Sequence, residues 1–342
     1  MKLRVSPKPA AFSACAAMAV RVFCGLSVDC VSPGYAAWLS AIIGAALSVP
    51  VLWMYGHVSV VGGRTARTAF QGFILAASLT GSAVTMADIA HSAGYLALDR
   101  VAPAVLLLPA ALALFWCITR NGDSIGYAAM IWARLFALLL LIVVILQFPY
   151  YRPEWLRPIL GSGWSTVARN AVRAAGWFCT IGGIWIFRED GGEGRSGKNA
   201  ILLSCAVSGA IAALLLALHA MLAPAFYSGA ALSWQLRLDA LLTNGRTPLY
   251  LQMPMIILWY GGLFHLLGCE GFAAAMLLQQ MAPRLDGRVC AGAVTLCASA
   301  LALSGFTGSR LLALLIRYQY IAAAGFCAIV AARGGLQTCA DA

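Results

Sequence analysis

A few ionisable side chains interrupt long apolar runs, and they are the residues that could bind a solute or move a proton. Arg21 lies about eleven residues into the apolar stretch 10–31, which puts it about 16 Å from the near end of a helix. A central arginine costs at least about 2.5–3.5 kcal/mol on insertion scales. We therefore expect Arg21 to face the protein interior with a partner. Its role is either functional or structural. In the functional case it attracts a ligand carboxylate or takes part in a proton relay, and in the structural case it clamps onto a backbone carbonyl or a buried acid.

Two further pairs of polar residues stand in apolar surroundings. Asp88 and His91 are three residues apart, so they share one helix face and predict a polar pair at the outer end of their helix. His265 and Glu270 are five residues apart, about 140° round a helix, and do not form an acid–base dyad with each other. Either of them alone could line a cavity.

The sequence contains no sign of a catalytic or metal centre. It has no HExxH or GxSxG motif and no paired carboxylates inside the apolar runs, so we predict that the protein is not an enzyme. Its eleven cysteines form no CxxC pair, which argues against a disulfide framework or a zinc knuckle. We expect no metal and no cofactor.

One apolar stretch, residues 164–188, contains three glycines that weaken a helix. Gly176, Gly182 and Gly183 interrupt a run of aromatic and aliphatic residues, and each costs a helix on the order of 1 kcal/mol relative to alanine. Freed backbone groups are tolerated in lipid only beside protein or a watery cavity. The pattern predicts an interrupted helix next to a midplane ligand site. The alternative is that the glycines only let another helix pack closely.

The composition is that of a polytopic membrane protein. Of its 342 residues, 62% are hydrophobic and only 10% are charged, against roughly 25% in a soluble domain. The net charge of +11 does not indicate nucleic-acid binding, because the basic residues are scattered between apolar runs. Ten apolar stretches predict ten transmembrane helices. They are residues 10–31, 35–57, 69–98, 101–119, 126–149, 164–188, 200–223, 248–281, 289–303 and 311–332.

The basic residues also predict the orientation. With the N-terminus inside, the inner loops receive twelve lysines and arginines and the outer loops six, which favours both termini in the cytoplasm. The first stretch has a possible signal-cleavage site at Ala17-Met18-Ala19. We predict that it is retained as a helix, because its apolar run is only half complete there and Arg21 follows at once.

Several collinear stretches resemble the B-subunit permeases of bacterial spore germinant receptors (the GerAB family), which are themselves similar to the amino acid–polyamine–organocation transporters. They are Arg21-Val22-Phe23 with residues 32–38 (SPGYAAW), residues 156–163 (LRPILGSG), and residues 237–241 (RLDAL) with residues 258–262 (LWYGG). One departure is Ile184, which follows the glycines where the family often has an acid. The nearest carboxylate is Glu189, so proton or cation coupling at this position is not expected.

The resemblance implies an all-α membrane protein of about ten transmembrane helices, a 5+5 inverted repeat of the LeuT/APC type with helices 1 and 6 interrupted. Residues 1–342 form a single membrane domain, with halves at 1–149 and 164–333 and an outer connecting loop at 150–163. The ligand lies between the two interrupted helices, where Gly25 matches the glycines of the second half. The residues expected to bind it are Gly25, Thr85, Gly176, Phe178, Thr180, Gly182, Gly183, Tyr260 and His265, with Arg21, Asp88 and Glu270 as buried polar or gating residues.

The same resemblance implies a function. It is that of a permease-like subunit of a spore germinant receptor, which binds a small germinant such as an amino acid and signals germination from the spore inner membrane. Its partners would be an A-type membrane subunit and a C-type lipoprotein. One alternative is an ion- or proton-coupled secondary transporter of amino acids or related solutes in the cell membrane. Another is a scaffold or membrane enzyme with no ligand in the helix bundle.

Overall fold

The fold is known from a computed structural model of the chain. It describes residues 7–28, 36–61, 64–96, 101–120, 122–157, 163–186, 194–222, 249–305, 311, 314–315 and 318–329. The helices are α1 (Pro7–Val28), α2 (Ala37–Val61), α3 (Arg64–Leu96), α4 (Pro103–Thr119), α5 (Gly122–Gln147), α6 (Trp164–Ile186), α7 (Gly194–Leu222), α9 (Leu249–Met281), α10 (Gly287–Leu303) and a C-terminal helix (Tyr318–Ile329). Two short 3-10 helices, η1 (Phe148–Tyr150) and η2 (Pro153–Leu156), follow α5.

The predicted all-α membrane architecture is confirmed. Each of the ten predicted spans overlaps one described helix, and the described part of the chain contains no β-strand. Five helical segments are long and apolar enough to cross a membrane by length and composition. They are Ala37–Tyr55, Thr68–Ala93, Gly122–Tyr150, Asn199–Leu218 and Ile256–Met281. The protein is a multi-pass membrane protein.

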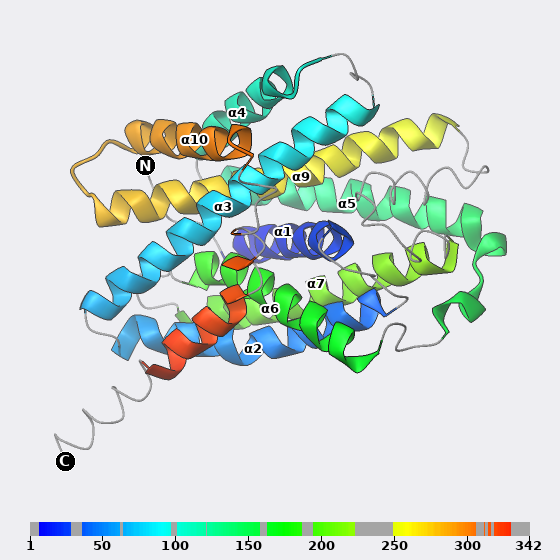
Figure 1. Ribbon diagram of the computed structural model, residues 1–342, viewed down its shortest axis with the longest axis horizontal. Coiled ribbons are helices and arrows are strands. Elements are labelled where there is room, and N and C mark those ends of the chain that lie inside the picture. Colours follow the sequence, from blue (N-terminus) through cyan, green and yellow to red (C-terminus); the bar gives the residue numbers. More distant parts are fainter. Residues whose placement is uncertain are drawn as a thin grey trace.

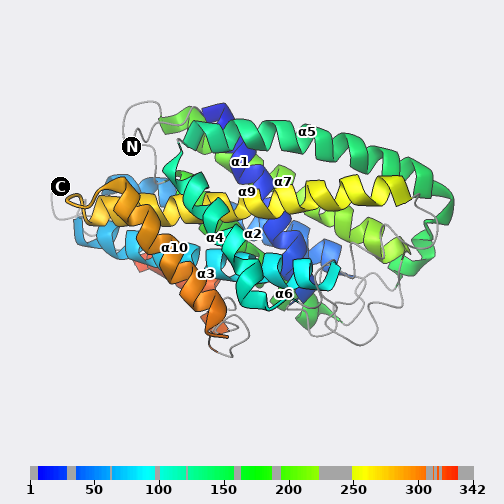
Figure 2. The ribbon, with the colours of Figure 1, turned by 90° about the horizontal axis from the view of Figure 1, so that it is seen from above.

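Helix α1 lies at the centre of the bundle (Figure 1), where it contacts α5, α6, α7 and α9. Its middle is rich in alanine, and Ala14, Ala17 and Met18 have no exposed surface. Small side chains let neighbouring helices approach closely in a membrane. Helix α2 packs along α6 and α7, whereas α3 packs along α9. Viewed from above, α5 runs along one edge of the bundle (Figure 2).

Helices α2 and α6 meet over a glycine and two alanines. A Cβ atom at Gly44 would lie 2.6 Å from Ala174 Cβ and 2.9 Å from the carbonyl oxygen of Ala171. Since the nearest of these atoms belong to a methyl group and a backbone, neither can swing aside as a long side chain would. The close approach of the two helix backbones therefore depends on a glycine at this position.

The structure corrects one detail of the sequence prediction: α1 and α6 are continuous in the residues described. Helix α1 runs through Gly25, and α6 runs through its three glycines. Neighbouring side chains fill the space at two of them, since a Cβ at Gly182 would lie 2.6 Å from Leu52 Cδ2 and one at Gly183 3.0 Å from Tyr55 Cε2. The alternative of close packing therefore accounts for these glycines.

Some predictions fall on residues outside the described ranges. Residues 29–35, 158–162 and 223–248, which carry part of the resemblance to the germinant-receptor permeases, lie outside them, as do Glu189 and both chain ends. The division into halves at 1–149 and 164–333 and the cytoplasmic position of the termini stay predictions.

Candidate functional site

A buried ion pair joins the central helix to α9. Arg21 Nη2 lies 3.6 Å from Glu270 Oε1, and the two side chains expose only 8% and 3% of their surface. A buried charge is tolerated only when it is paired and its remaining polar atoms are satisfied. Arg21 thus faces the interior with a partner, as its depth in the apolar stretch predicts. The partner is an acid far away in the sequence.

Helix α3 supports this ion pair in two ways, with the hydroxyl group of Thr85 and with the space left by the missing side chain of Gly81. Thr85 Oγ1 accepts a hydrogen bond from Arg21 Nη1 at 3.3 Å and donates one to Glu270 Oε2 at 3.1 Å. The same hydroxyl lies 3.0 Å from the carbonyl oxygen of Gly81. A Cβ atom at Gly81 would lie only 2.5 Å from Glu270 Oε1. The absence of a side chain at Gly81 therefore leaves the room that the carboxylate occupies.

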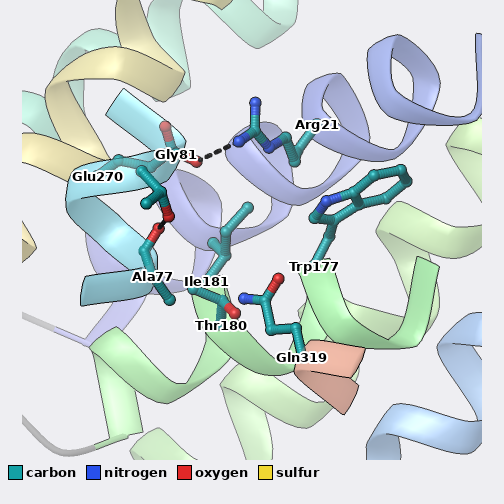
Figure 3. Close-up of a pocket in the computed structure, with 9 residues that line it drawn as sticks. Arg21, Ala77, Gly81, Trp177, Thr180, Ile181, Glu270 and Gln319 are labelled. Atoms are coloured by element: carbon teal, nitrogen blue, oxygen red, sulfur yellow. Dashed lines mark hydrogen bonds and ion pairs between the residues drawn. The ribbon is translucent and has the colours of Figure 1, made fainter. Parts of the chain in front are cut away.

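A small cavity opens beside the ion pair, between α1, α3, α6, α9 and the C-terminal helix. It is lined by Arg21, Ala77, Thr80, Gly81, Trp177, Thr180, Ile181, Glu270 and Gln319. In Figure 3 the Arg21 guanidinium points toward the Glu270 carboxylate, while Thr180 and Gln319 lie across the cavity. The space amounts to about 20 Å³, which is enough for about one water molecule.

The lining offers several groups that can bind a polar or charged ligand. A guanidinium can hold a carboxylate through two parallel hydrogen bonds. The Glu270 carboxylate can accept a proton or face a cation, and the Gln319 amide both donates and accepts. Thr180 is 5% exposed, and its hydroxyl donates to the carbonyl oxygen of Gly176 at 3.0 Å. Among the described residues, no group of three or more histidine, cysteine or acidic side chains is placed to hold a metal ion.

The structure brings four of the residues singled out from the sequence to this cavity. They are Arg21, Thr85, Thr180 and Glu270. Thr85 forms hydrogen bonds with both members of the Arg21–Glu270 ion pair, and the other three line the cavity. Asp88 lies one turn along α3 from Thr85 and is half-buried.

The other predicted ligand-binding residues lie elsewhere in the bundle. Gly176 faces the backbone of Tyr320, with a Cβ-to-nitrogen distance of 3.3 Å. Phe178 is fully buried. Tyr260 is half-buried on α9, beside Ser92 of α3. None of these side chains lines the described cavity; Gly182 and Gly183 pack against α2, and Gly25 lies in the last turns of α1.

His265 takes part in a separate cluster that ties α1 to α9. Its Nε2 lies 3.3 Å from Ser13 Oγ and 3.2 Å from the Ser13 carbonyl oxygen, while Cys269 Sγ lies 3.1 Å from the same Ser13 Oγ. The imidazole also stacks on Trp132 of α5, with ring centroids 6.5 Å apart. The cluster satisfies His265 within the protein and holds three helices together.

Sequence reasoning missed six of the residues that line the cavity, among them Gly81, Trp177 and Gln319. Gln319 carried a usable signal, because it is a polar residue in the apolar stretch 311–332. Gly81 and Trp177 carried none, since a glycine or a tryptophan on an apolar helix usually serves packing. Their roles follow only from the neighbours that the fold brings to them.

We expect Thr85→Val to destabilise the protein by about 1.5–3 kcal/mol, because it removes a hydroxyl that bonds both charged groups. The free energy of unfolding in mixed micelles measures the loss. Thr119→Val is the matched control, since the Thr119 hydroxyl is exposed and donates only to Trp116 of its own helix. Its effect should stay within about 0.5 kcal/mol. Equal effects of the two substitutions would contradict the bridging role of Thr85.

Comparison with known proteins supports the fold rather than a family. No protein-family model matches the chain, and no curated protein matches its sequence. Its structure is similar to that of a Na⁺-coupled sialic acid symporter in a substrate-bound outward-open state, with a TM-score of 0.62 and 12% identity over 94% of this chain and 79% of the symporter. It is also similar to the manganese transporter of Eremococcus coleocola, with a TM-score of 0.52 and 13% identity over 95% of this chain and 76% of the transporter. The chain therefore has the LeuT fold, as its sequence predicts, and the likeness assigns no family within that fold.

Proposed function

We propose that the protein is a proton- or ion-coupled secondary transporter of a small solute that carries a carboxylate, with amino acids as the solute class. The observation that carries the proposal is the buried Arg21–Glu270 pair beside a cavity at the centre of the bundle. The similarity in fold to a Na⁺-coupled symporter and a manganese transporter supports it. Such folds bind their solutes and coupling ions near the membrane midplane.

The proposed cycle exchanges one partner of Arg21 for another. In the empty site Glu270 neutralises the guanidinium. When a solute arrives, its carboxylate takes the place of Glu270 on Arg21, and Glu270 takes up a proton. The protonated Glu270 and Thr85 can keep a hydrogen bond, because their oxygens lie 3.1 Å apart. Counted over Arg21, Glu270 and the solute carboxylate, the charge is unchanged, so Arg21 avoids the cost of about 3–5 kcal/mol for an unpaired buried charge.

This cycle makes Glu270→Gln an informative variant. The amide mimics the protonated acid in shape and charge, so solute exchange should persist while uptake no longer responds to a proton gradient. In liposomes with the purified protein, one pH unit stores about 1.4 kcal/mol and supports about tenfold accumulation of solute with one proton. We expect wild-type protein to approach that ratio for labelled amino acids, and Glu270→Gln to stay near equal concentrations on both sides.

The control for this experiment is Glu154→Gln, which makes the same change on an exposed side chain in η2. It should accumulate solute as the wild type does. Accumulation by Glu270→Gln equal to that of the wild type would rule out Glu270 as the coupling group. Accumulation driven only by a sodium gradient would replace the proton by Na⁺ as the coupling ion.

A germinant-receptor subunit is the second candidate. It is favoured by the collinear likeness of Arg21-Val22-Phe23, residues 156–163 and residues 258–262 to the receptor permeases. In that role the cavity would bind a germinant amino acid and shift the bundle between two states without net transport. An A-type membrane subunit and a C-type lipoprotein would be the partners, in the spore inner membrane.

Binding and transport assays separate the two candidates. Both predict that an amino acid at a hundred times its dissociation constant stabilises the protein by about 2.7 kcal/mol in a thermal-shift assay. Only the transporter predicts accumulation against a gradient. Stabilisation without accumulation would favour the sensor, whereas accumulation would exclude a pure sensor.

A further inference from the structure

A second cavity lies on the outside of the bundle, far larger than the central one and almost wholly apolar. It is a groove of about 610 Å³ between α5 and α7 with α1 as its floor. Alanines of α1 and α5, among them Ala16, Ala19, Ala133 and Ala137, line it. Its α7 wall includes Leu214, whose side chain is 54% exposed. An apolar groove with a floor of small residues fits the side of a transmembrane helix.

One charged side chain stands in this groove. Arg134 lines it and is exposed. It is twelve residues from the start of α5 and thirteen from its end, so it lies about 18–20 Å along the helix axis from either end. None of the described residues forms an ion pair or a hydrogen bond with Arg134. Within its own chain, the arginine therefore has no described counterion at the depth where a charge costs most.

Lipid is a poor counterion at this depth. Anionic headgroups lie at the membrane surface, whereas Arg134 lies near the middle of α5, a helix longer than the hydrocarbon layer of about 30 Å is thick. Arginines near helix ends reach the headgroups by extending their side chains, but this one starts from the centre. An acyl chain would fill the apolar groove and still leave the guanidinium without an anion. Another transmembrane helix that carries a carboxylate satisfies both parts of the surface, because its apolar side fills the groove and its carboxylate pairs with the guanidinium.

A second copy of this chain does not supply that carboxylate from its described residues. Glu270 is buried and paired, and Asp88 is half-buried on α3. The other described acids lie at helix ends or in connections: Asp123, Glu154 and Asp286. Among the described residues of a second copy, no acid is thus placed to pair with Arg134 near the middle of α5, and we take the partner to be a different membrane protein.

We propose that the groove between α5 and α7 is the docking surface for a transmembrane helix of a partner protein that carries an aspartate or glutamate near the middle of its span. The partner's apolar side fills the groove over the alanines, and its carboxylate pairs with Arg134. This surface lies apart from the Arg21–Glu270 site, so the inference holds whether the protein carries a solute or senses one.

Model peptides test the proposal directly. The probes are two leucine-rich transmembrane peptides of about 20 residues, one with a central glutamate and one with glutamine in its place. Energy transfer from a dye on the peptide to a dye on the full-length protein reports binding in phosphatidylcholine liposomes. We expect the glutamate peptide to bind about 3- to 30-fold more tightly, the range for polar contacts between transmembrane helices.

Three variants identify the contact. Arg134→Gln should abolish the preference for the glutamate peptide, whereas Arg284→Gln, on an exposed arginine after α9, should leave it intact. Ala137→Trp fills the groove without touching the charge and should weaken both peptides. All three positions are exposed or face the groove, so the bundle should fold in each variant. Stabilisation of each variant by an amino acid in a thermal-shift assay checks that the variant is folded.

The proposal is overturned if wild-type protein binds the two peptides equally, or if Arg134→Gln keeps the preference. It is also overturned if phosphatidylglycerol in the liposomes removes the preference, because a lipid headgroup then reaches Arg134. Self-association that depends on Arg134 and excludes both peptides would assign the groove to a second copy of the chain and overturn it as well.

Discussion

Removing either member of the Arg21–Glu270 pair alone should cost about 3–5 kcal/mol of folding free energy, because the other charge then stays buried without a partner. Both side chains are more than nine-tenths buried, so bulk water cannot replace the missing charge. Arg21→Ala and Glu270→Ala are the single variants. The free energy of unfolding in mixed micelles measures the effect.

The double variant distinguishes an ion pair from two separate packing contacts. With both charges gone, neither is left uncompensated, so Arg21→Ala/Glu270→Ala should lose clearly less than the sum of the two single losses. Arg284→Ala and Glu154→Ala are the controls on exposed side chains and should stay within about 0.5 kcal/mol of the wild type. Strictly additive losses in the double variant would show that the two charges do not stabilise each other.

Two identical substitutions at different glycines should have opposite effects. Gly44→Ala places a methyl group 2.6 Å from Ala174 Cβ and 2.9 Å from a backbone oxygen of α6. Helices α2 and α6 must then separate, and overpacking of this kind costs about 1–3 kcal/mol. Larger residues such as leucine should prevent folding of the bundle.

Gly292→Ala is the matched comparison in α10. No heavy atom lies within 4 Å of the place that its Cβ would take. Because alanine favours a helix by about 1 kcal/mol over glycine, this variant should be as stable as the wild type or slightly more stable. Thermal unfolding of both variants in one detergent is sufficient. If both glycines respond alike, the contact between α2 and α6 is not as tight as the distances indicate.

The helices could be predicted from the sequence because their cause is local. A run of apolar residues long enough to cross a bilayer forms a helix whatever its neighbours are. Each of the ten predicted spans therefore overlaps a described helix, with bounds that agree to within about seven residues. The interruption of α1 and α6 could not be decided in this way. A glycine that opens a helix and a glycine that admits a neighbour look the same in sequence. The difference lies in Leu52 and Tyr55, which α2 brings against α6.

Prediction of the site from the sequence meets the same limit, because it too depends on contacts between distant helices. The depth of Arg21 in an apolar stretch predicts a partner, and the sequence predicts Glu270 as a buried polar or gating residue and Thr85 as a ligand-binding one. Their meeting depends on how α1, α3 and α9 cross, which no local pattern encodes. Gly81 illustrates this best, because its only visible property is to leave space for an acid on another helix.

The size of the central cavity has a consequence for any solute. A space for about one water molecule does not admit an amino acid, so the helices around it must part before one enters. The ion pair between Arg21 and Glu270 also joins α1 to α9 beside that space. In the proposed cycle, a solute that takes Arg21 from Glu270 therefore breaks this contact as it binds. That cycle would make recognition of the solute and opening of the bundle one event, carried by the atoms of this one ion pair.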